Sequence, residues 1–125
     1  MNVVDSSAWL EYFADTPLAS EFAPIIEDAL RLIVPAITIY EVNKRLITQH
    51  RESVAEKAMI LMQEGRVVDL TAALAVEASR QAGLNKLSLA DSIIYTTTIL
   101  HGAILWTTDK HFKDLPNVVY REKLP

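Results

Sequence analysis

Cysteine is absent from the 125-residue chain, which excludes disulfide bonds, zinc sites built from thiolates and a cysteine nucleophile. Only three glycines occur and they are scattered, so the sequence has no glycine-rich loop to bind a phosphate. The three histidines form no pair with the spacing of a zinc site. The longest apolar stretch, LIVPAITIY, is far shorter than a membrane span and contains a proline, so we expect no association with a membrane.

The chain also has no excess of basic residues. Its formal net charge is −4, with a pI near 5.3, which argues against a protein that only coats nucleic acid. A content of 50% hydrophobic and 22% charged residues is typical of a globular protein, and the length fits a single domain over residues 1–125. The first residues, MNVVDSSAW, do not have the pattern of a secretory signal, so we expect a cytoplasmic protein.

Short β-branched runs alternate with one or two amphipathic segments along the whole chain. No hairpin signal joins the strands, and this alternation predicts an α/β fold with a central parallel sheet of four to five strands covered by helices on both faces. Thr71 is expected to begin one helix, and Gly83 to lie just past its end. The predicted strands are 2–5, 33–35, 66–70, 103–108 and 117–120, and the predicted helices are 6–14, 20–32, 36–50, 52–64, 72–82 and 86–100.

Two acids follow predicted strands. Asp5 comes after the first strand and Asp109 after the fourth, and ligand sites in parallel α/β sheets lie beyond the carboxyl ends of the strands. Both acids are also suited to cap the helical segment that follows them. Local sequence does not decide between a helix-capping role and a ligand-site role for either residue. A ligand-site role brings both carboxylates to a single place.

A third acid, Asp91, occurs in the amphipathic stretch KLSLADSIIYTTTIL. Ser88 precedes it by three residues, the spacing of a capping box, and a negative charge in the first helical turn interacts favourably with the helix dipole. Capping explains less well why apolar residues flank this turn on both sides. Moving a charged carboxylate from water into such apolar surroundings costs on the order of several kcal/mol, unless another group pairs with the charge. The apolar neighbours are Leu87, Leu89, Ala90, Ile93 and Ile94.

A fourth acid, Glu41, lies in TIYEVNKR. Lys44 and Arg45 follow it at the spacing of helical ion pairs, which is typical of an exposed surface acid. If the four acids converge, two bare carboxylates about 4 Å apart repel by about 4 kcal/mol at an effective dielectric constant of about 20. Such a cluster requires protons or cations, and hard oxygen ligands select Mg²⁺ or Mn²⁺. The chemistry that follows is metal-assisted hydrolysis of a phosphodiester bond.

Four stretches, in this order, carry a resemblance to a known family: VVDSSAWLEYF, PAITIYEV, LSLADSIIYTTTILHGA and LWTTDKHF. Over nearly its whole length the chain resembles the PIN-domain ribonucleases, and among these it is most similar to the VapC-like toxins of toxin–antitoxin pairs. The resemblance implies that Thr107 lies beside a metal ion and that Ser6 helps to hold the carboxylate of Asp5. The acidic site that it implies consists of Asp5, Glu41, Asp91 and Asp109.

The resemblance also implies an activity and partners. It predicts a Mg²⁺- or Mn²⁺-dependent endoribonuclease that cuts RNA such as tRNA or rRNA, inhibits translation, forms a homodimer and is neutralised by a cognate antitoxin protein. Relatives with a further acid after the Thr-x-Asp motif have it where this chain has Lys110 and His111.

Two other interpretations compete with a nuclease. A receiver-like signalling domain is also a short parallel α/β chain, with Asp69 after RVV as its phosphate acceptor. That scheme requires adjacent acids after the first strand, where the sequence has only Asp5, and it leaves Glu41 and Asp91 without a role. The second competitor is a catalytically inactive PIN-like module that binds RNA or a protein partner.

Overall fold

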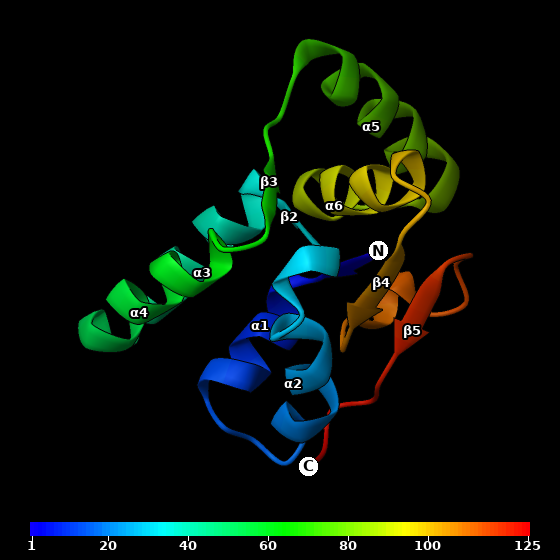
Figure 1. Cartoon of the computed structure of the whole chain (residues 1–125). Helices are drawn as coiled ribbons and strands as arrows, with labels where there is room; N and C mark the ends of the chain where they lie inside the picture. The colour runs from blue at the N-terminus through cyan, green and yellow to red at the C-terminus, as the bar shows by residue number, and fades with distance from the viewer.

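A parallel sheet of five strands runs through the centre of the computed structural model, which describes all 125 residues (Figure 1). Every pair of neighbouring strands is parallel, and the order across the sheet is β3-β2-β1-β4-β5. This confirms the predicted fold class. The strands are β1 (Asn2–Val4), β2 (Leu32–Pro35), β3 (Arg66–Val68), β4 (Ile104–Thr107) and β5 (Val118–Tyr120).

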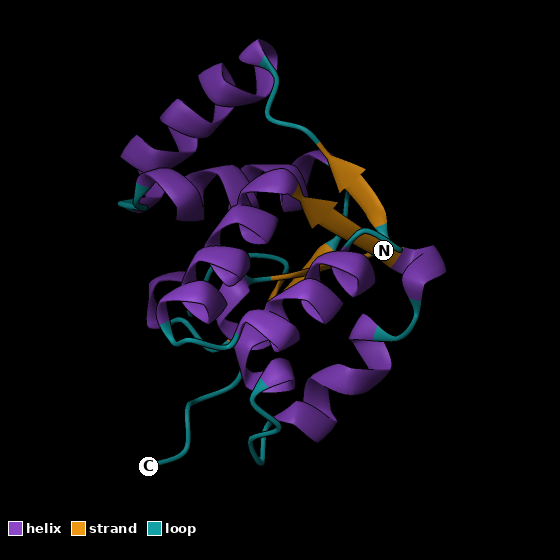
Figure 2. Ribbon diagram, turned by 90° about the vertical axis from the view of Figure 1, so that its left-hand side faces the viewer, coloured by secondary structure: helices purple, strands orange, loops and turns teal.

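Six α-helices connect the strands and cover the sheet. Figure 2 shows helices on both sides of the strands. No helix is both long enough and apolar enough to cross a membrane. The helices are α1 (Ser6–Phe13), α2 (Ala19–Ile26), α3 (Ala36–Thr48), α4 (Glu52–Met62), α5 (Ala72–Asn85) and α6 (Leu89–Leu100), and short 3-10 turns occupy Ala29–Arg31 and Lys110–Phe112.

The period-two alternation of the central strands divides the core between the two faces of the sheet. Val4 and Val34 pack with residues of α1, α2, α3 and α4, while Val3 and Ile33 pack with residues of α6 and with Phe112. Successive strand residues point to opposite faces, so a short run of buried valine and isoleucine fills both layers at once. The prediction that each strand is a short apolar run is therefore confirmed for β1 and β2.

Each predicted helix differs from the observed one at one or both ends, and two of these differences have a cause in tertiary packing. The segment predicted as one helix over 20–32 is α2 followed by a 3-10 turn, and Leu32 belongs to β2 because it pairs with β1 and is buried. The other helix, α5, does not stop before Gly83 but continues to Asn85, where Lys86 adopts the left-handed conformation that ends it. Packing of α5 along α6 extends the helix through a glycine that local sequence marks as a stop.

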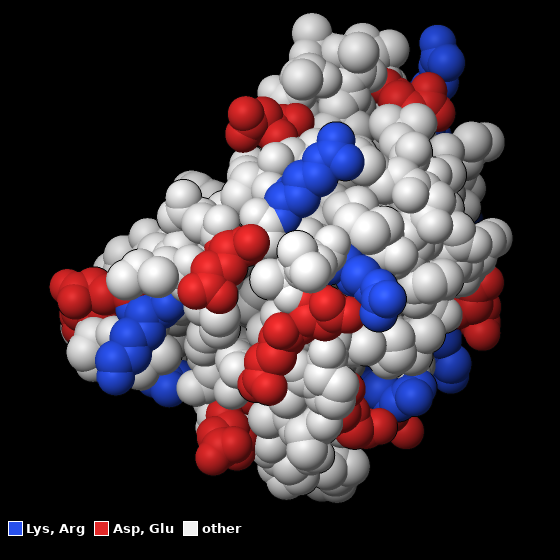
Figure 3. All heavy atoms as spheres, in the orientation of Figure 1, with Lys and Arg blue, Asp and Glu red and all other residues white.

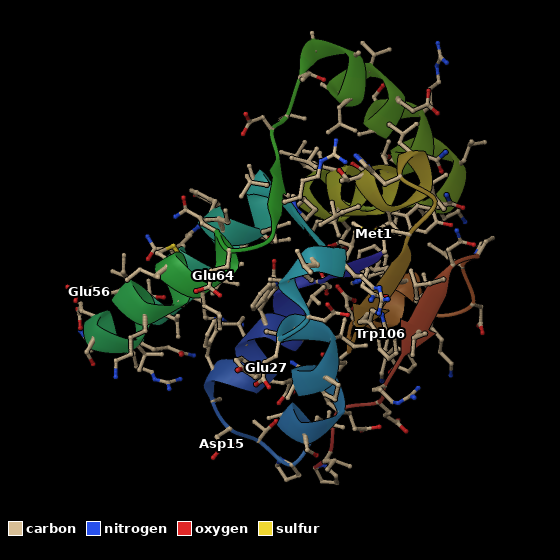
Figure 4. All side chains as sticks on the ribbon, viewed as in Figure 1. Met1, Asp15, Glu27, Glu56, Glu64 and Trp106 are labelled. Atoms are coloured by element: carbon tan, nitrogen blue, oxygen red, sulfur yellow. The ribbon has the colours of Figure 1, made fainter.

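The strand order brings the two acid-bearing strand ends together. The chain builds outward from β1 through β2 to β3, and then returns to the other side of β1 with β4 and β5. The strands β1 and β4 are hydrogen-bonded neighbours, with Val4 opposite Trp106, and the indole of Trp106 donates to the Asn2 side chain at 2.9 Å (Figure 4). The crevice where the order reverses, beyond the carboxyl ends of β1 and β4, is the usual place for a ligand.

Glycine-to-alanine substitutions test the helix boundaries. Gly83 is exposed inside α5 and an added methyl group meets no atom within 4 Å, so Gly83→Ala should stabilise the protein by about 0.5–1 kcal/mol. At Gly65 the methyl carbon would lie 3.0 Å from the Leu32 carbonyl oxygen and from Val34, so Gly65→Ala should destabilise it by about 1–3 kcal/mol. Urea unfolding measures both changes. A destabilising Gly83→Ala would contradict the continuous helix.

Candidate active site

Asp5 occupies the junction between β1 and α1 and is only 3% exposed. It stands at the N-cap position, but its side chain does not cap the helix. Instead Oδ2 accepts hydrogen bonds from the hydroxyl groups of Ser7, at 2.6 Å, and Thr107, at 2.8 Å. Oδ1 has no hydrogen-bond partner in the protein, so one oxygen of this buried carboxylate is held rigidly while the other remains available to a ligand.

The two hydroxyl groups that hold Asp5 also join α1 to the end of β4. Ser7 Oγ accepts from the backbone N–H of Thr108 at 3.1 Å, and Thr107 Oγ1 accepts from the backbone N–H of Asp109 at 2.9 Å. Thr107 thus contacts Asp5 directly, and that it lies beside a metal ion stays a prediction. The expectation that Ser6 holds Asp5 is wrong, because Ser7 fills that role.

Ser6 holds a different acid. Its hydroxyl group donates to Oε1 of Glu41 at 2.6 Å, which connects the first turn of α1 to the second turn of α3. Glu41 is half-buried and forms no ion pair within 4.0 Å with Lys44 or Arg45. Its second oxygen, Oε2, has no protein partner, so the interpretation of Glu41 as an exposed acid paired along the helix does not describe this side chain.

Asp91 fits both sequence interpretations. Ser88 is the N-cap of α6, and its hydroxyl group accepts from the backbone N–H of Asp91 at 3.4 Å. The Asp91 side chain is nevertheless only 15% exposed. The apolar surroundings expected from the sequence are only partly present, because Leu87 is buried whereas Leu89 is 77% exposed. The start of the helix thus aims a carboxylate into the crevice and is capped as well.

Asp109 precedes the 3-10 turn after β4 and also caps it, through a 2.9 Å hydrogen bond from the backbone N–H of His111. The imidazole Nδ1 of His111 lies 2.7 Å from the same carboxylate oxygen and 3.9 Å from Asp91 Oδ2. Ligand atoms of Asp91, Asp109 and His111 all lie within 4.8 Å of one another. His111 is not among the site residues predicted from the sequence, although it follows Asp109 by two residues.

The acids influence one another electrostatically. Burial raises the pKa of Asp5 from 3.8 to about 6, and the neighbouring carboxylates of Asp91 and Asp109 add to this rise, while hydrogen bonds from Ser7 and Thr107 oppose it. Burial also raises the pKa of Asp91, and Asp109 and Glu41 contribute in the same direction. Carboxylates in this state favour proton binding or the approach of a cation.

A cavity of about 510 Å³ opens between these groups. Its oxygen-rich donor set includes carboxylate oxygens of Asp5 and Glu41 that have no protein partner, together with two acids of raised pKa, and it suits a hard divalent cation such as Mg²⁺ or Mn²⁺. All four acids predicted from the sequence line the cavity. Its walls are formed by Asp5, Ser6, Ser7, Leu10, Glu11, Ala14, Glu41, Arg45, Gln49, Arg51, Asp91, Asp109 and Lys123.

The receiver-like interpretation does not agree with the structure. Receiver domains have the strand order 2-1-3-4-5, whereas β1 here lies between β2 and β4. Asp69, the acid required by that interpretation, is exposed beyond the edge strand β3 and does not line the cavity.

The chain matches one protein-family model and several solved structures. The PIN domain family model matches residues 3–118. No curated protein sequence is a significant match. A solved toxin–antitoxin complex from Klebsiella pneumoniae is 22% identical and superposes with a TM-score of 0.81 over 98% of this chain and 100% of the other.

Two further solved structures share the fold. Mycobacterium tuberculosis VapC20, described as a toxin that cleaves the sarcin-ricin loop, is 16% identical with a TM-score of 0.78, over 94% of this chain and 97% of the other. A DNA-bound VapBC from Salmonella typhimurium is 15% identical with a TM-score of 0.72, over 97% and 96% of the two chains.

The raised pKa of Asp5 predicts how stability depends on pH when no metal is bound. Below about pH 4 the side chain is neutral in the folded and unfolded states. As the pH rises from about 4 to about 6, the unfolded chain has lost its proton while the folded chain still keeps one on the buried carboxyl group, so stability falls, and it levels off above about pH 6. The loss amounts to about 3 kcal/mol.

Asp5→Asn removes this charge and keeps an oxygen that accepts from Ser7 and Thr107. In EDTA near pH 8 the variant should be more stable than the wild type by up to about 3 kcal/mol, and the difference should disappear near pH 4. Urea unfolding at several pH values measures it, with Asp69→Asn as the exposed control. Equal stability of wild type and Asp5→Asn at pH 8 would contradict the buried charge.

Proposed function

The chain belongs to the PIN domain family, and on that premise we propose that it is a metal-dependent endoribonuclease acting as the toxin of a toxin–antitoxin pair. The observation that carries the proposal is the arrangement of four carboxylates around one cavity, where burial and mutual repulsion raise the pKa of two of them. Unpaired, such a cluster destabilises the fold, which is the pattern expected of a functional site.

Asp5, Asp91 and Asp109 would hold a Mg²⁺ or Mn²⁺ ion, with Glu41 beside them. Their unbonded carboxylate oxygens supply the hard ligands that these ions prefer. His111 approaches Asp91 and Asp109 from the exposed side. When bound, the ion would supply positive charge to offset the carboxylates and a Lewis acid for hydrolysis of a phosphodiester bond.

The protein's own contribution is to fix these carboxylates before any ligand arrives. Ser7 and Thr107 hold one oxygen of Asp5, and Ser6 holds one oxygen of Glu41, so neither side chain must reorganise. The unpartnered oxygen of Glu41 is a suitable acceptor for a proton from water in the cavity.

RNA is the proposed substrate, and tRNA or rRNA is the proposed class. Cleavage of these RNAs would inhibit translation, so we propose that the protein acts in the cytoplasm. Support comes from the shared fold with VapC20, which is described as a toxin that cleaves the sarcin-ricin loop. A cognate antitoxin is the proposed protein partner, because four of the structural neighbours are described as a toxin–antitoxin complex or as VapBC.

Replacing one acid tests the activity. Asp91→Asn keeps the shape of the side chain and the cap of α6 but removes the charge, so metal-dependent cleavage of RNA should fall by at least about a hundredfold. The measurement is electrophoresis of total RNA after incubation of purified protein with Mg²⁺ or Mn²⁺, with and without EDTA. Asp69→Asn, an acid outside the cavity, is the matched control and should cut like the wild type.

Two results would overturn the assignment. If Asp91→Asn cuts as fast as the wild type, Asp91 is only a helix cap. If the wild type never cuts in Mn²⁺ after removal of all bound antitoxin, the chain is an inactive PIN-like module that binds RNA or a partner.

We also propose that the chain forms a homodimer. Several large apolar side chains of α5 and α6 are exposed, and pairing of these two helices between two copies of the chain would bury them. Light scattering should give twice the chain mass of 14.0 kDa, and Leu84→Glu should reduce it to the mass of one chain. A monomeric wild type at micromolar concentration would contradict the proposal. The exposed residues are Val76, Leu84, Leu89 and Leu100.

A further inference from the structure

The cavity extends well beyond the acids. Glu41 and Arg45 on α3 and Gln49, the residue that ends this helix, are spaced four residues apart and all line the cavity, so its wall follows α3 for about 12 Å. On the facing helix α1 the lining continues from Ser7 through Glu11 to Ala14. The cavity is therefore a trough between α1 and α3 with the acidic cluster at one end.

The other end of the trough is basic. Arg45 and Arg51 line it, and Lys123 of the C-terminal segment lines the same cavity. None of the three has a carboxylate within 4.0 Å, although Glu11 and Glu41 are also lining residues. Three cations without anionic partners, facing a shared concave surface, form a ready site for an anion.

One of these cations is held in place by the fold. The Arg51 guanidinium donates to the carbonyl oxygen of Phe13 at the end of α1, at 3.1 Å, and is half-buried. Lys123 is exposed, but the segment that carries it is tethered two residues earlier, where Arg121 pairs with Glu21 at 3.0 Å and its backbone N–H donates to the carbonyl oxygen of Thr107. Arg51 is thus preorganised, whereas Arg45 and Lys123 are exposed side chains that can turn toward a ligand.

We propose that Arg45, Arg51 and Lys123 form a phosphate-binding subsite for the RNA backbone, which holds a phosphate next to the one at the acidic cluster. This inference rests on the proposed function for the class of ligand. Guanidinium and ammonium groups bind phosphate oxygens without reading bases, so the subsite positions the strand and contributes affinity but not sequence specificity.

The net negative charge of the molecule means that RNA binding depends on a local basic site. The net charge of −4 repels RNA at long range, and acidic and basic side chains are interspersed over the face seen in Figure 3. Attraction for a polyanion must therefore be local. The trough is the place where unpaired cations and the acidic cluster share one cavity, so the strand is drawn to the groups that are proposed to cut it.

The test separates binding from cleavage. Asp91→Asn/Asp109→Asn removes two carboxylates, so its binding to a fluorescein-labelled oligouridine can be measured by anisotropy in EDTA without any metal or cutting. In this background Arg45→Ala and Lys123→Ala should each weaken binding about threefold. Each should also reduce the slope of log affinity against log salt by about 0.7, the value for one lost phosphate contact on a single strand.

Two matched variants sharpen the test. Lys44→Ala removes the same charge from the position next to Arg45, but Lys44 lies over the Tyr40 ring outside the trough, so binding should not change. Glu11→Gln removes a negative charge from the trough, so binding should tighten. Because Arg51 also bonds to the backbone, Arg51→Lys and a melting curve accompany any change at that residue.

The outcomes are distinct from those of the cleavage test. Equal loss from Lys44→Ala and Arg45→Ala would show that only overall charge matters, and no gain from Glu11→Gln would show that the RNA does not lie in the trough; either result would overturn the subsite. Displacement of the oligouridine by polyglutamate as readily as by polyuridylate would assign the basic end to an acidic polypeptide instead. A wild type that does not cut RNA, with the predicted binding pattern intact, would leave the subsite standing and remove the nuclease.

Discussion

The buried carboxylate of Asp5 is the constraint on which the rest of the site depends. A charged group at 3% exposure is tolerated only if its surroundings supply hydrogen bonds, and here they come from Ser7 on α1 and Thr107 on β4. These contacts require β4 to lie directly beside β1, so the strand order and the acid are linked. The same two hydroxyl groups orient the backbone that leads to Asp109. The hydrogen bonds that this buried charge requires thus determine how β1 and β4 end.

The sequence predicts the fold well because strand burial and helix periodicity are local patterns with few alternatives. All five strands and all six helices occur where β-branched runs and amphipathic segments indicate them. The errors are at boundaries that tertiary contacts decide. Leu32 leaves its predicted helix because pairing with β1 buries it, and α5 passes through Gly83 because it packs along α6. Neither contact is visible in a local window of sequence.

The site is predictable only as a set of acids. Asp5 and Asp109 follow strands, and parallel topology brings such ends to one edge, whereas the placement of Glu41 and Asp91 beside them came from family resemblance. Ser6 and Ser7 could not be told apart, because adjacent residues in a first helical turn point in directions about 100° apart and each finds a different acid. Lys123 lies 14 residues after Asp109, and nothing in that spacing indicates a shared cavity.

The two ends of the trough are electrostatically interdependent. Without a cation, the acidic cluster repels a phosphate by an amount comparable to what three exposed cations contribute, so the basic end alone holds RNA weakly. A bound divalent ion reverses the sign of the acidic end, and both ends then attract the same strand. Metal and RNA should consequently bind with positive coupling, since each reduces the electrostatic cost of the other. The carboxylates that destabilise the fold are therefore the origin of the metal-dependent affinity for RNA as well as of the proposed chemistry. Neutralising them would stabilise the fold and would remove the dependence of RNA binding on metal.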